Sequence, residues 1–221
     1  MGERAHEAYS EHRFWSAGCV IERADREHLN THTKSVHLIL ASASPRRAEL
    51  LRSSGFDFDV EAANIDETPR AGEPPAAYTQ RVARDKARHV AASHAGENVV
   101  VLGADTEVVL GRRVLGKPAG EDDARRMLRT LAGQIHEVLT AVILLGSGRE
   151  AAEVVTTRVW FADMTDAEID WYVASGEPMD KAGAYAIQGL GARFVERIDG
   201  SWSNVVGLPV AVVHRLLRAV Q

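Results

Sequence analysis

A run of apolar residues near the middle of the chain restricts the fold more than any other feature. Residues 99–106 read Val-Val-Val-Leu-Gly-Ala-Asp-Thr, and their four consecutive large apolar side chains indicate a strand that is buried on both faces. Such strands lie at the centre of α/β sheets. Asp105 comes at the end of this predicted strand, where open α/β sheets commonly bind ligands, although an aspartate there can also cap a turn. We expect Asp105 to be functional.

Residues 38–51 predict a short strand, a tight turn and a helix. Pro45 suits the first helical position with Ser44 as the N-cap, because the N–H that proline lacks would have no partner there. The start of such a helix presents free backbone N–H groups and the positive end of the helix dipole, which suits a polyphosphate. The alternative is an ordinary capped helix with two solvated arginines. The side chains expected at this anion site are Ser42, Ser44, Arg46 and Arg47.

The helix predicted at residues 76–93 carries a lysine within its apolar stripe. Val82, Lys86 and Val90 are four residues apart and therefore share one face of the helix. A lysine in this position either extends its ammonium group to solvent or points into a site that needs a cation.

Residues 111–118, Gly-Arg-Arg-Val-Leu-Gly-Lys-Pro, match the first seven positions of a phosphate-binding P-loop. The eighth position must be Ser or Thr, and a helix must continue from it. Pro118 has no hydroxyl group and disfavours helical backbone at Lys117, so we exclude a P-loop. Lys117 is then either a phosphate contact or a plain turn lysine.

The remaining pattern is that of one α/β domain at residues 36–221, preceded by an N-terminal extension at residues 1–35 that is poorly structured or weakly helical. His136 is expected to be a structural hydrogen-bonding residue rather than a ligand. The other expected elements are a strand at 56–60, a helix at 121–131, a hairpin of 137–145 and 153–161, a helix opened by a capping box at 165–168, an irregular ordered loop at 177–189, a strand at 194–198, a second loop at 201–208 and a C-terminal helix after Pro209.

The composition excludes several classes of protein. A formal net charge of −5 argues against a general nucleic-acid or anionic-membrane binder, since both need an excess of basic residues. The one cysteine, Cys19, permits no intramolecular disulfide and suits a reducing cytoplasm. No apolar run approaches the ~20 residues of a membrane span, and the N-terminus lacks the apolar segment of a secretory signal. We expect a cytoplasmic protein without nucleic-acid or membrane partners.

The unusual charged positions point to one kind of chemistry. Cations such as Lys86 and Lys117 would neutralise a polyphosphate, and carboxylates such as Glu67 and Asp105 would hold a divalent metal and activate water. The combination indicates metal-assisted hydrolysis of a nucleotide phosphoanhydride.

Seven segments also occur, in order, in a known family. From about Val36 to the C-terminus the chain resembles the Maf nucleotide pyrophosphatases. The segments that carry the resemblance are Ala-Ser-Ala-Ser-Pro-Arg-Arg at 41–47, Asp-Glu-Thr at 66–68, Arg-Asp-Lys-Ala at 84–87, Gly-Ala-Asp-Thr at 103–106, Gly-Lys-Pro at 116–118, Gly-Glu-Pro-Met-Asp-Lys-Ala-Gly-Ala-Tyr-Ala-Ile-Gln-Gly at 176–189 and Asn-Val-Val-Gly-Leu-Pro at 204–209.

The resemblance implies hydrolysis of a nucleoside triphosphate to the monophosphate and pyrophosphate, with Mg²⁺ or Mn²⁺ as cofactor. It implies an α/β fold with a Maf/ITPase-like mixed sheet, flanking helices and two lobes around a central cleft, often in a homodimer. The implied roles are a proton acceptor at Asp105, metal ligands at Glu67 and Asp105, a catalytic cation at Lys86, and substrate contacts at Ser42, Ser44, Arg46, Arg47, Thr106, Lys117 and Gln188.

Three of these positions, Arg46, Thr106 and Gln188, correspond to the specificity positions of the subgroup that acts on dTTP and UTP. The resemblance also implies a house-cleaning role against non-standard nucleotides, with a link to cell-division arrest. Two alternatives stay open. One is the same chemistry on 7-methyl-GTP or other modified purine nucleotides, and the other is a non-catalytic nucleotide-binding regulator of septum formation.

Overall fold

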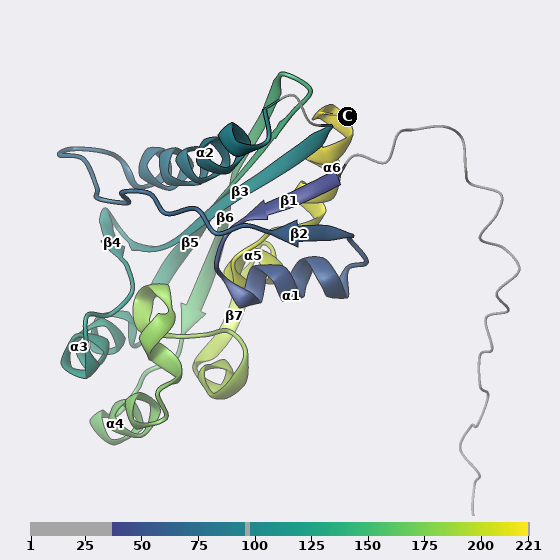
Figure 1. Cartoon of the computed structure of the whole chain (residues 1–221). Coiled ribbons are helices and arrows are strands. Elements are labelled where there is room, and N and C mark those ends of the chain that lie inside the picture. Colours follow the sequence, from purple (N-terminus) through teal and green to yellow (C-terminus); the bar gives the residue numbers. More distant parts are fainter. Residues whose placement is uncertain (1–36, 96–97, 221) are drawn as a thin grey trace, which may run out of the picture. The chain divides into compact units, whose positions relative to one another are not determined.

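The computed structural model describes residues 37–95 and 98–220; the predicted N-terminal extension at residues 1–35, including Cys19, lies outside them. The described residues form a mixed α/β fold with one seven-stranded sheet and flanking helices, which confirms the predicted fold class (Figure 1). None of the described helices is both long and apolar enough to cross a membrane.

The sheet has the strand order β2-β1-β3-β5-β6-β7, and β4 pairs with the last residues of β3. β1 is parallel to both of its neighbours, whereas the other pairs are antiparallel. The strands are β1 (His37–Ala41), β2 (Phe58–Val60), β3 (Val99–Leu110), β4 (Arg113–Leu115), β5 (Ile135–Gly146), β6 (Arg149–Phe161) and β7 (Val195–Asp199).

The predicted helices are confirmed, and the described residues add one α-helix and three short 3₁₀ helices that were not predicted. The helices are α1 (Pro45–Ser53), α2 (Pro75–Ser93), α3 (Glu121–Leu131), α4 (Asp166–Ala174), α5 (Trp202–Val206) and α6 (Val210–Val220), and the short 3₁₀ helices are η2 (Glu177–Asp180), η3 (Ala182–Ala184) and η4 (Gly189–Phe194). The irregular loop at 177–189 is therefore ordered by η2 and η3. The loop predicted at 201–208 was wrong, because the Ser201 side chain accepts a hydrogen bond from the Asn204 N–H and so caps α5.

Alternate residues of β3 face the two helical layers of the upper part of the domain. Val101 packs with Ala83 and Ala87 of α2 on one face of the sheet, while Leu102 packs with residues of α1 and α6 on the other. Gly103 lets α2 approach closely, because a Cβ there would overlap the Ala83 carbonyl oxygen and lie 2.8 Å from the Ala87 Cβ. This burial on both faces confirms the central position predicted for the strand.

A separate hydrophobic core forms the lower part of the domain, around α3 and α4 (Figure 1). It joins Leu128 and Tyr172 from these helices to Val108, Val138 and Phe161 at the lower ends of the central strands. Within it, His136 is almost fully buried and its Nε2 lies 2.7 Å from the Tyr185 hydroxyl, which confirms the structural role expected for this histidine. Burial lowers the pKa of His136 to about 4.

The prediction that Asp105 ends its strand was wrong. β3 continues for five more residues to Leu110 and pairs with β5 from Val100↔Gly146 to Val109↔Glu137. The polar residues at positions 105–107 do not end the strand, because the antiparallel ladder to β5 satisfies their backbone and Val108–Leu110 resume the apolar pattern. Asp105 therefore lies in the interior of a long strand.

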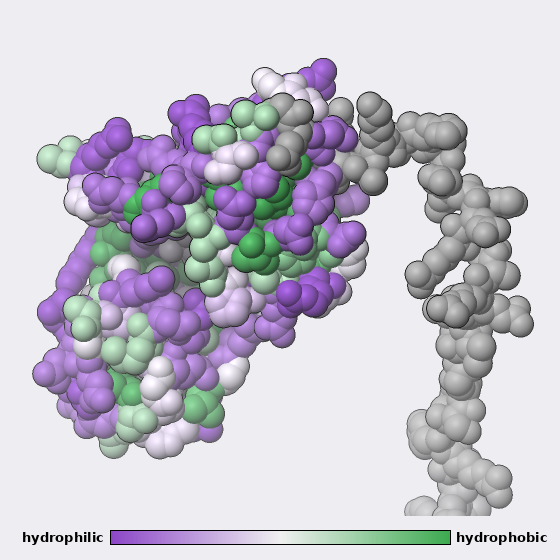
Figure 2. Space-filling model, in the orientation of Figure 1, coloured by the Kyte–Doolittle hydropathy of each residue, from purple (hydrophilic) through white to green (hydrophobic). Residues whose placement is uncertain are grey.

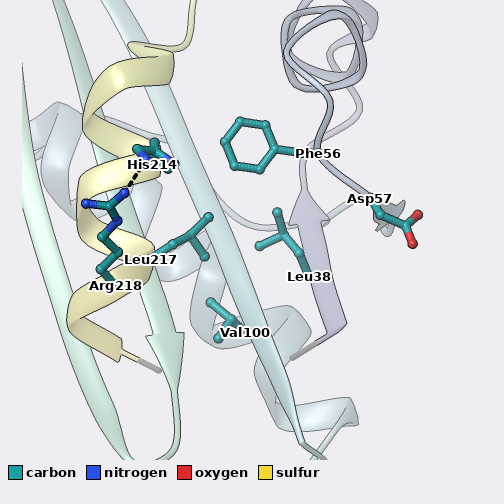
Figure 3. Close-up of a pocket in the computed structure, with 7 residues that line it drawn as sticks. All are labelled: Leu38, Phe56, Asp57, Val100, His214, Leu217 and Arg218. Atoms are coloured by element: carbon teal, nitrogen blue, oxygen red, sulfur yellow. Dashed lines mark hydrogen bonds between the residues drawn. The ribbon is translucent and has the colours of Figure 1, made fainter. Parts of the chain in front are cut away.

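Two cavities flank the sheet. The smaller, of about 290 Å³, lies against α6 and has a mainly apolar lining of Leu38, Phe56, Val100 and Leu217, and it contains no predicted site residue (Figure 3). The larger has a volume of about 500 Å³ and is lined by residues of all three hydrophobic clusters, among them Ala41, Val108 and Val206. Hydrophilic residues predominate on the face of the domain seen in Figure 2.

Candidate active site

The larger cavity brings together every site residue that the sequence predicted. They come from six separated stretches of the chain, and their side chains range from almost fully buried to exposed. The predicted residues that line the cavity are Ser42, Ser44, Arg46, Arg47, Glu67, Lys86, Asp105, Thr106, Lys117 and Gln188.

An interruption in the strand pairing of β3 creates this cavity. One edge of β3 is covered by β5, and the other edge pairs first with β1, as far as Ala41↔Gly103, and then with β4 from Val108↔Leu115 onwards. In the described structure residues 104–107 therefore have no strand partner on that second edge. Side chains from both faces of the strand reach the cavity there, and Asp105, Thr106 and Glu107 all line it.

The turn before α1 forms one wall of the cavity. Pro45 occupies the first helical position and Ser44 the N-cap position, as predicted, but the Ser44 side chain makes no capping hydrogen bond. The Ser42 hydroxyl instead accepts a hydrogen bond from the Ser44 N–H at 3.2 Å. The turn thus holds Ser42 inward through the backbone and leaves the first N–H groups of α1 free of a side-chain cap.

Arg47 is a buried arginine that the protein holds in one orientation. Its Nε donates to the Gly207 carbonyl at 2.9 Å, Nη1 to the Ser42 hydroxyl at 3.0 Å and Nη2 to the Thr106 hydroxyl at 3.1 Å. Burial lowers the pKa of Arg47, and the nearby Asp105 opposes that shift. A guanidinium has five N–H donors, so Arg47 can still donate to an anion in the cavity without changing its orientation.

Arg46, one residue earlier, bridges two segments that are distant in the sequence. Its Nη1 lies 2.8 Å from Asp180 Oδ2, and its Nη2 donates to the Asp180 carbonyl oxygen at 3.3 Å. The Asp180 carboxylate also accepts from Lys181 Nζ at 2.6 Å. These contacts join α1 to η2 beside the cavity.

Three carboxylates, Glu67, Asp105 and Glu107, form an acidic wall of the cavity. Lys86 lies among them and is 8% exposed. Its Nζ lies 2.8 Å from Asp105 Oδ1 and 3.0 Å from Glu67 Oε1. The apolar stripe of α2 therefore points this lysine into the cavity, and the alternative of a lysine that extends to solvent is wrong. Tyr78, two turns earlier on α2, donates its hydroxyl to the Glu67 carbonyl at 3.0 Å and so fixes the loop that carries Glu67.

Glu107 is a cavity residue that the sequence reasoning missed. It is 8% exposed, and its Oε2 is buried without a hydrogen-bond partner in the described structure. Desolvation, followed by the charge of Asp105, raises the pKa of Glu107 to about 8. The period of two along a strand could have identified it, because residue 107 must share a face with Asp105.

The carboxylates of this wall fit a divalent cation that is bound together with a substrate. Within residues 37–95 and 98–220, no group of three or more His, Cys, Asp or Glu side chains is arranged to hold a metal ion. Mg²⁺ is commonly bound by one or two carboxylates and completed by water and substrate phosphates, so a full protein cage is not required. The unpartnered Oδ2 of Asp105 is an oxygen of the kind that such an ion needs.

The segment that carries Gln188 is ordered by a network behind the cavity. Glu177 accepts hydrogen bonds from the N–H groups of Leu190 at 3.0 Å and Gly191 at 2.9 Å, and from the Tyr172 hydroxyl at 2.8 Å. The same hydroxyl accepts from the Ala186 N–H at 3.1 Å. Gly191 is required because a Cβ there would overlap that hydroxyl. The backbone is therefore fixed on both sides of Gln188, whose side chain is exposed.

Lys117 follows β4 and lines the cavity with an exposed side chain. Residues 111–118 form the β3–β4 turn, strand β4 and its exit, and no helix begins at Lys117, which confirms that the segment is not a P-loop. The Gly116 carbonyl accepts a hydrogen bond from the Gly183 N–H at 3.1 Å, and this contact fixes the backbone beside Lys117.

Known proteins resemble this chain over the whole described domain. The family model described as Maf-like protein matches residues 37–220. The dTTP/UTP pyrophosphatase of Koribacter versatilis is 56% identical over 82% of this chain and 93% of its own length, and that of Shewanella oneidensis is 52% identical over 82% and 97%. Among solved structures, the Staphylococcus aureus Ham1 protein is 12% identical, with a TM-score of 0.47, over 84% of this chain and 100% of its own. On the family match and the sequence identities, this chain belongs to the Maf family.

Proposed function

We propose that this protein is a nucleoside triphosphate pyrophosphatase that hydrolyses dTTP and UTP to the monophosphate and pyrophosphate. The observation that carries the proposal is the single cavity in which Lys86, Asp105 and Glu67 face the arginines of the α1 turn. The names of the Koribacter versatilis and Shewanella oneidensis relatives support both the reaction and the pyrimidine substrates.

The cations and hydroxyls of the cavity would bind the triphosphate. We assign phosphate contacts to Arg47, Lys86 and Lys117, with Ser42 and Ser44 beside them at the start of α1. Because Arg47 is already oriented by three hydrogen bonds, little side-chain entropy is lost when it binds an anion.

Three positions of the same cavity would distinguish the nucleotides, namely Arg46, Thr106 and Gln188. Gln188 offers both a donor and an acceptor, which suits the edge of a pyrimidine base. The ordered backbone on which Gln188 lies supports this role, because a site on a fixed backbone positions its side chains better than one on a mobile loop.

Asp105 would act as the proton acceptor. The oxygen of a water molecule forms a bond to the α-phosphorus, its proton passes to Asp105, and the bond from the α-phosphorus to the bridging oxygen breaks. Pyrophosphate leaves with that electron pair. The contact with the Lys86 ammonium group at 2.8 Å supports this role, because it holds the carboxylate in position in the cavity.

A divalent cation, Mg²⁺ or Mn²⁺, would be held by Asp105 and a second carboxylate, for which the family resemblance points to Glu67. When bound, such an ion neutralises charge on the phosphates and lowers the pKa of water. Lys86 contacts both carboxylates and so orients them toward the cavity.

The wider role is proposed on the family resemblance. We infer a cytoplasmic enzyme, in a homodimer, that limits the incorporation of non-standard nucleotides and is linked to cell-division arrest. The domain at residues 36–221 would carry the activity alone, because the cavity is built from residues 41–207.

A nucleotide panel with pyrophosphate detection tests the proposal. Wild-type protein is incubated with dTTP, UTP, CTP, 5-methyl-UTP, pseudo-UTP and 7-methyl-GTP, with Mg²⁺ or Mn²⁺ and then with EDTA. We expect hydrolysis of dTTP and UTP above the others, its loss in EDTA, and the same profile for residues 36–221. A preference for 7-methyl-GTP would contradict the proposed pyrimidine substrates. Nucleotide binding without pyrophosphate release would contradict the proposed reaction and would favour a non-catalytic regulator.

A further inference from the structure

Two buried carboxylate oxygens in the cavity lack any partner. In the described structure, four buried side-chain nitrogen or oxygen atoms have no hydrogen-bond partner, and two of them are Asp105 Oδ2 and Glu107 Oε2. Their side chains are only 5% and 8% exposed. Buried carboxylates are normally paired, hydrogen-bonded or bound to a metal, because removal of their charge from water is otherwise unfavourable.

The two side chains are neighbours on one face of β3. They are separated by one residue in a strand, so both point to the same side of the sheet, about 7 Å apart along the strand axis. Both line the larger cavity at the edge of β3 that lacks a strand partner.

The cations of the protein do not occupy these oxygens. Lys86 contacts the other oxygen of Asp105 and Glu67 Oε1, and in the described structure its ammonium group forms no ion pair with Glu107. Arg47 is bonded to Ser42, Thr106 and the Gly207 carbonyl. Glu67 differs from the two β3 residues because its side chain is 50% exposed, so water can solvate its carboxylate.

A bound nucleotide would also bring its phosphates close to these carboxylates. Glu67, Asp105 and Glu107 line the same cavity as the cations proposed to bind the phosphates, Arg47, Lys86 and Lys117. A triphosphate adds several negative charges to the same cavity. Repulsion would oppose binding unless a small cation lay between the two groups of oxygens.

We propose that Glu107 is the second protein ligand of the divalent cation, next to Asp105, with nucleotide phosphate oxygens completing the coordination. Glu67 then acts mainly by holding Lys86. This inference rests on the proposed function for its substrate. Two protein carboxylates plus phosphate agree with the absence, in the described residues, of a site built from three protein ligands.

Direct binding of Mn²⁺ tests the proposal. The full chain is titrated with Mn²⁺, followed by electron paramagnetic resonance, in the presence of a UTP analogue with a methylene bridge between the α- and β-phosphorus. We expect Glu107→Gln to weaken Mn²⁺ binding by at least about 10-fold, since loss of a carboxylate that merely supports a metal ligand already weakens affinity about 10–100-fold. Glu67→Gln should weaken it less, and Asp122→Asn on α3 should leave it unchanged.

Two results would overturn the proposal: Mn²⁺ affinity in Glu107→Gln equal to that of wild type, or a greater loss in Glu67→Gln than in Glu107→Gln. Circular dichroism checks that each variant is folded. If Glu107→Gln does not fold, Glu107→Asp keeps the charge on a shorter side chain and should bind Mn²⁺ with reduced affinity, whereas wild-type affinity would overturn the proposal.

The cation proposal and the proposed function can fail separately. Pyrophosphate release from dTTP by the wild type is measured on the same preparations. Hydrolysis with Mn²⁺ binding that is independent of Glu107 overturns only the ligand assignment. Glu107-dependent Mn²⁺ binding without hydrolysis of any nucleotide overturns the reaction and supports the cation site.

Discussion

Strand β3 and helix α3 both carry clustered acids, but the two clusters differ in every physical respect. On α3, Glu121 and Asp122 are 64% and 103% exposed and both pair with Arg125, each at 3.1 Å. On β3, Asp105 and Glu107 are almost fully buried, and each keeps one oxygen without a partner.

The comparison shows which acids serve the fold. Acids in the first turn of α3 interact favourably with the helix dipole and form ion pairs within one turn, so the stability of the helix explains why they are there. In the described structure no hydrogen bond reaches the two unpartnered oxygens of β3, and a buried polar atom without a partner destabilises a protein unless a ligand binds it. The burial of an acid, rather than the number of acids, therefore indicates the site.

The largest effect is expected at the buried member of the comparison. Asp105→Asn removes the proton acceptor and should lower the rate of pyrophosphate release by about 10²–10⁴-fold, while a non-hydrolysable nucleotide still binds. Steady-state kinetics with dTTP measures the change. Asp122→Asn on α3 is the matched control and should keep the wild-type rate; unchanged turnover in Asp105→Asn would exclude the assigned role.

An intermediate effect is expected at His136, which is buried and neutral. Its folded-state pKa of about 4 lies below the ordinary value of 6.5, so folding favours the uncharged ring. The associated stability is fully present above pH 6.5 and is lost as the pH falls toward 4, by about 3 kcal/mol in the free energy of unfolding.

Urea unfolding between pH 8 and pH 4 measures this loss. His136→Gln can still form a hydrogen bond with Tyr185 but does not titrate, so its stability should decline less over the same range. Parallel stability curves for the two proteins would show that burial of His136 is not the source of the acid sensitivity.

The smallest effect is expected on α3. Arg125→Gln removes ion pairs to Glu121, Asp122 and Asp170, yet all three partners are at least 60% exposed. Exposed pairs are screened by water, so the denaturation midpoint should fall only slightly and the hydrolysis rate should not change. Thermal unfolding measures the midpoint, and the dTTP assay measures the hydrolysis rate. A large fall in the midpoint or in the rate would contradict the distinction between the two acidic clusters.

Most elements could be predicted because their signals are local. Pro45, the capping box at Thr165 and Glu168, and the turn predicted at 146–148 each act within a few residues. The structure confirms the first two and places the turn at 147–148. The extension of β3 beyond Asp105 could not be predicted from local pattern. Its backbone is satisfied by β5, about 35 residues later, and three polar residues in succession resemble a strand end.

The candidate site was predictable as a set of residues but not as an arrangement. Lys86 and Asp105 were found because each interrupts a regular pattern of apolar residues. Lys86 lies inside the apolar stripe of a helix, and Asp105 follows an apolar run in a strand. Glu107 was missed because a strand thought to end at residue 106 leaves no face on which to place it.

The amino-acid sequence by itself determined the kinds of element, the central place of residues 99–102 and the chemical types of the site residues. Those properties follow from periods of 2 and 3.6 residues and from the limits on proline, which act locally. Only the tertiary structure decided that Lys86 contacts both Asp105 and Glu67, that Arg47 is held by Ser42, Thr106 and Gly207, and that Glu107 is buried. These contacts join segments up to 160 residues apart. They depend on the short stretch of β3 between its pairing with β1 and its pairing with β4, where one edge of the strand has no partner.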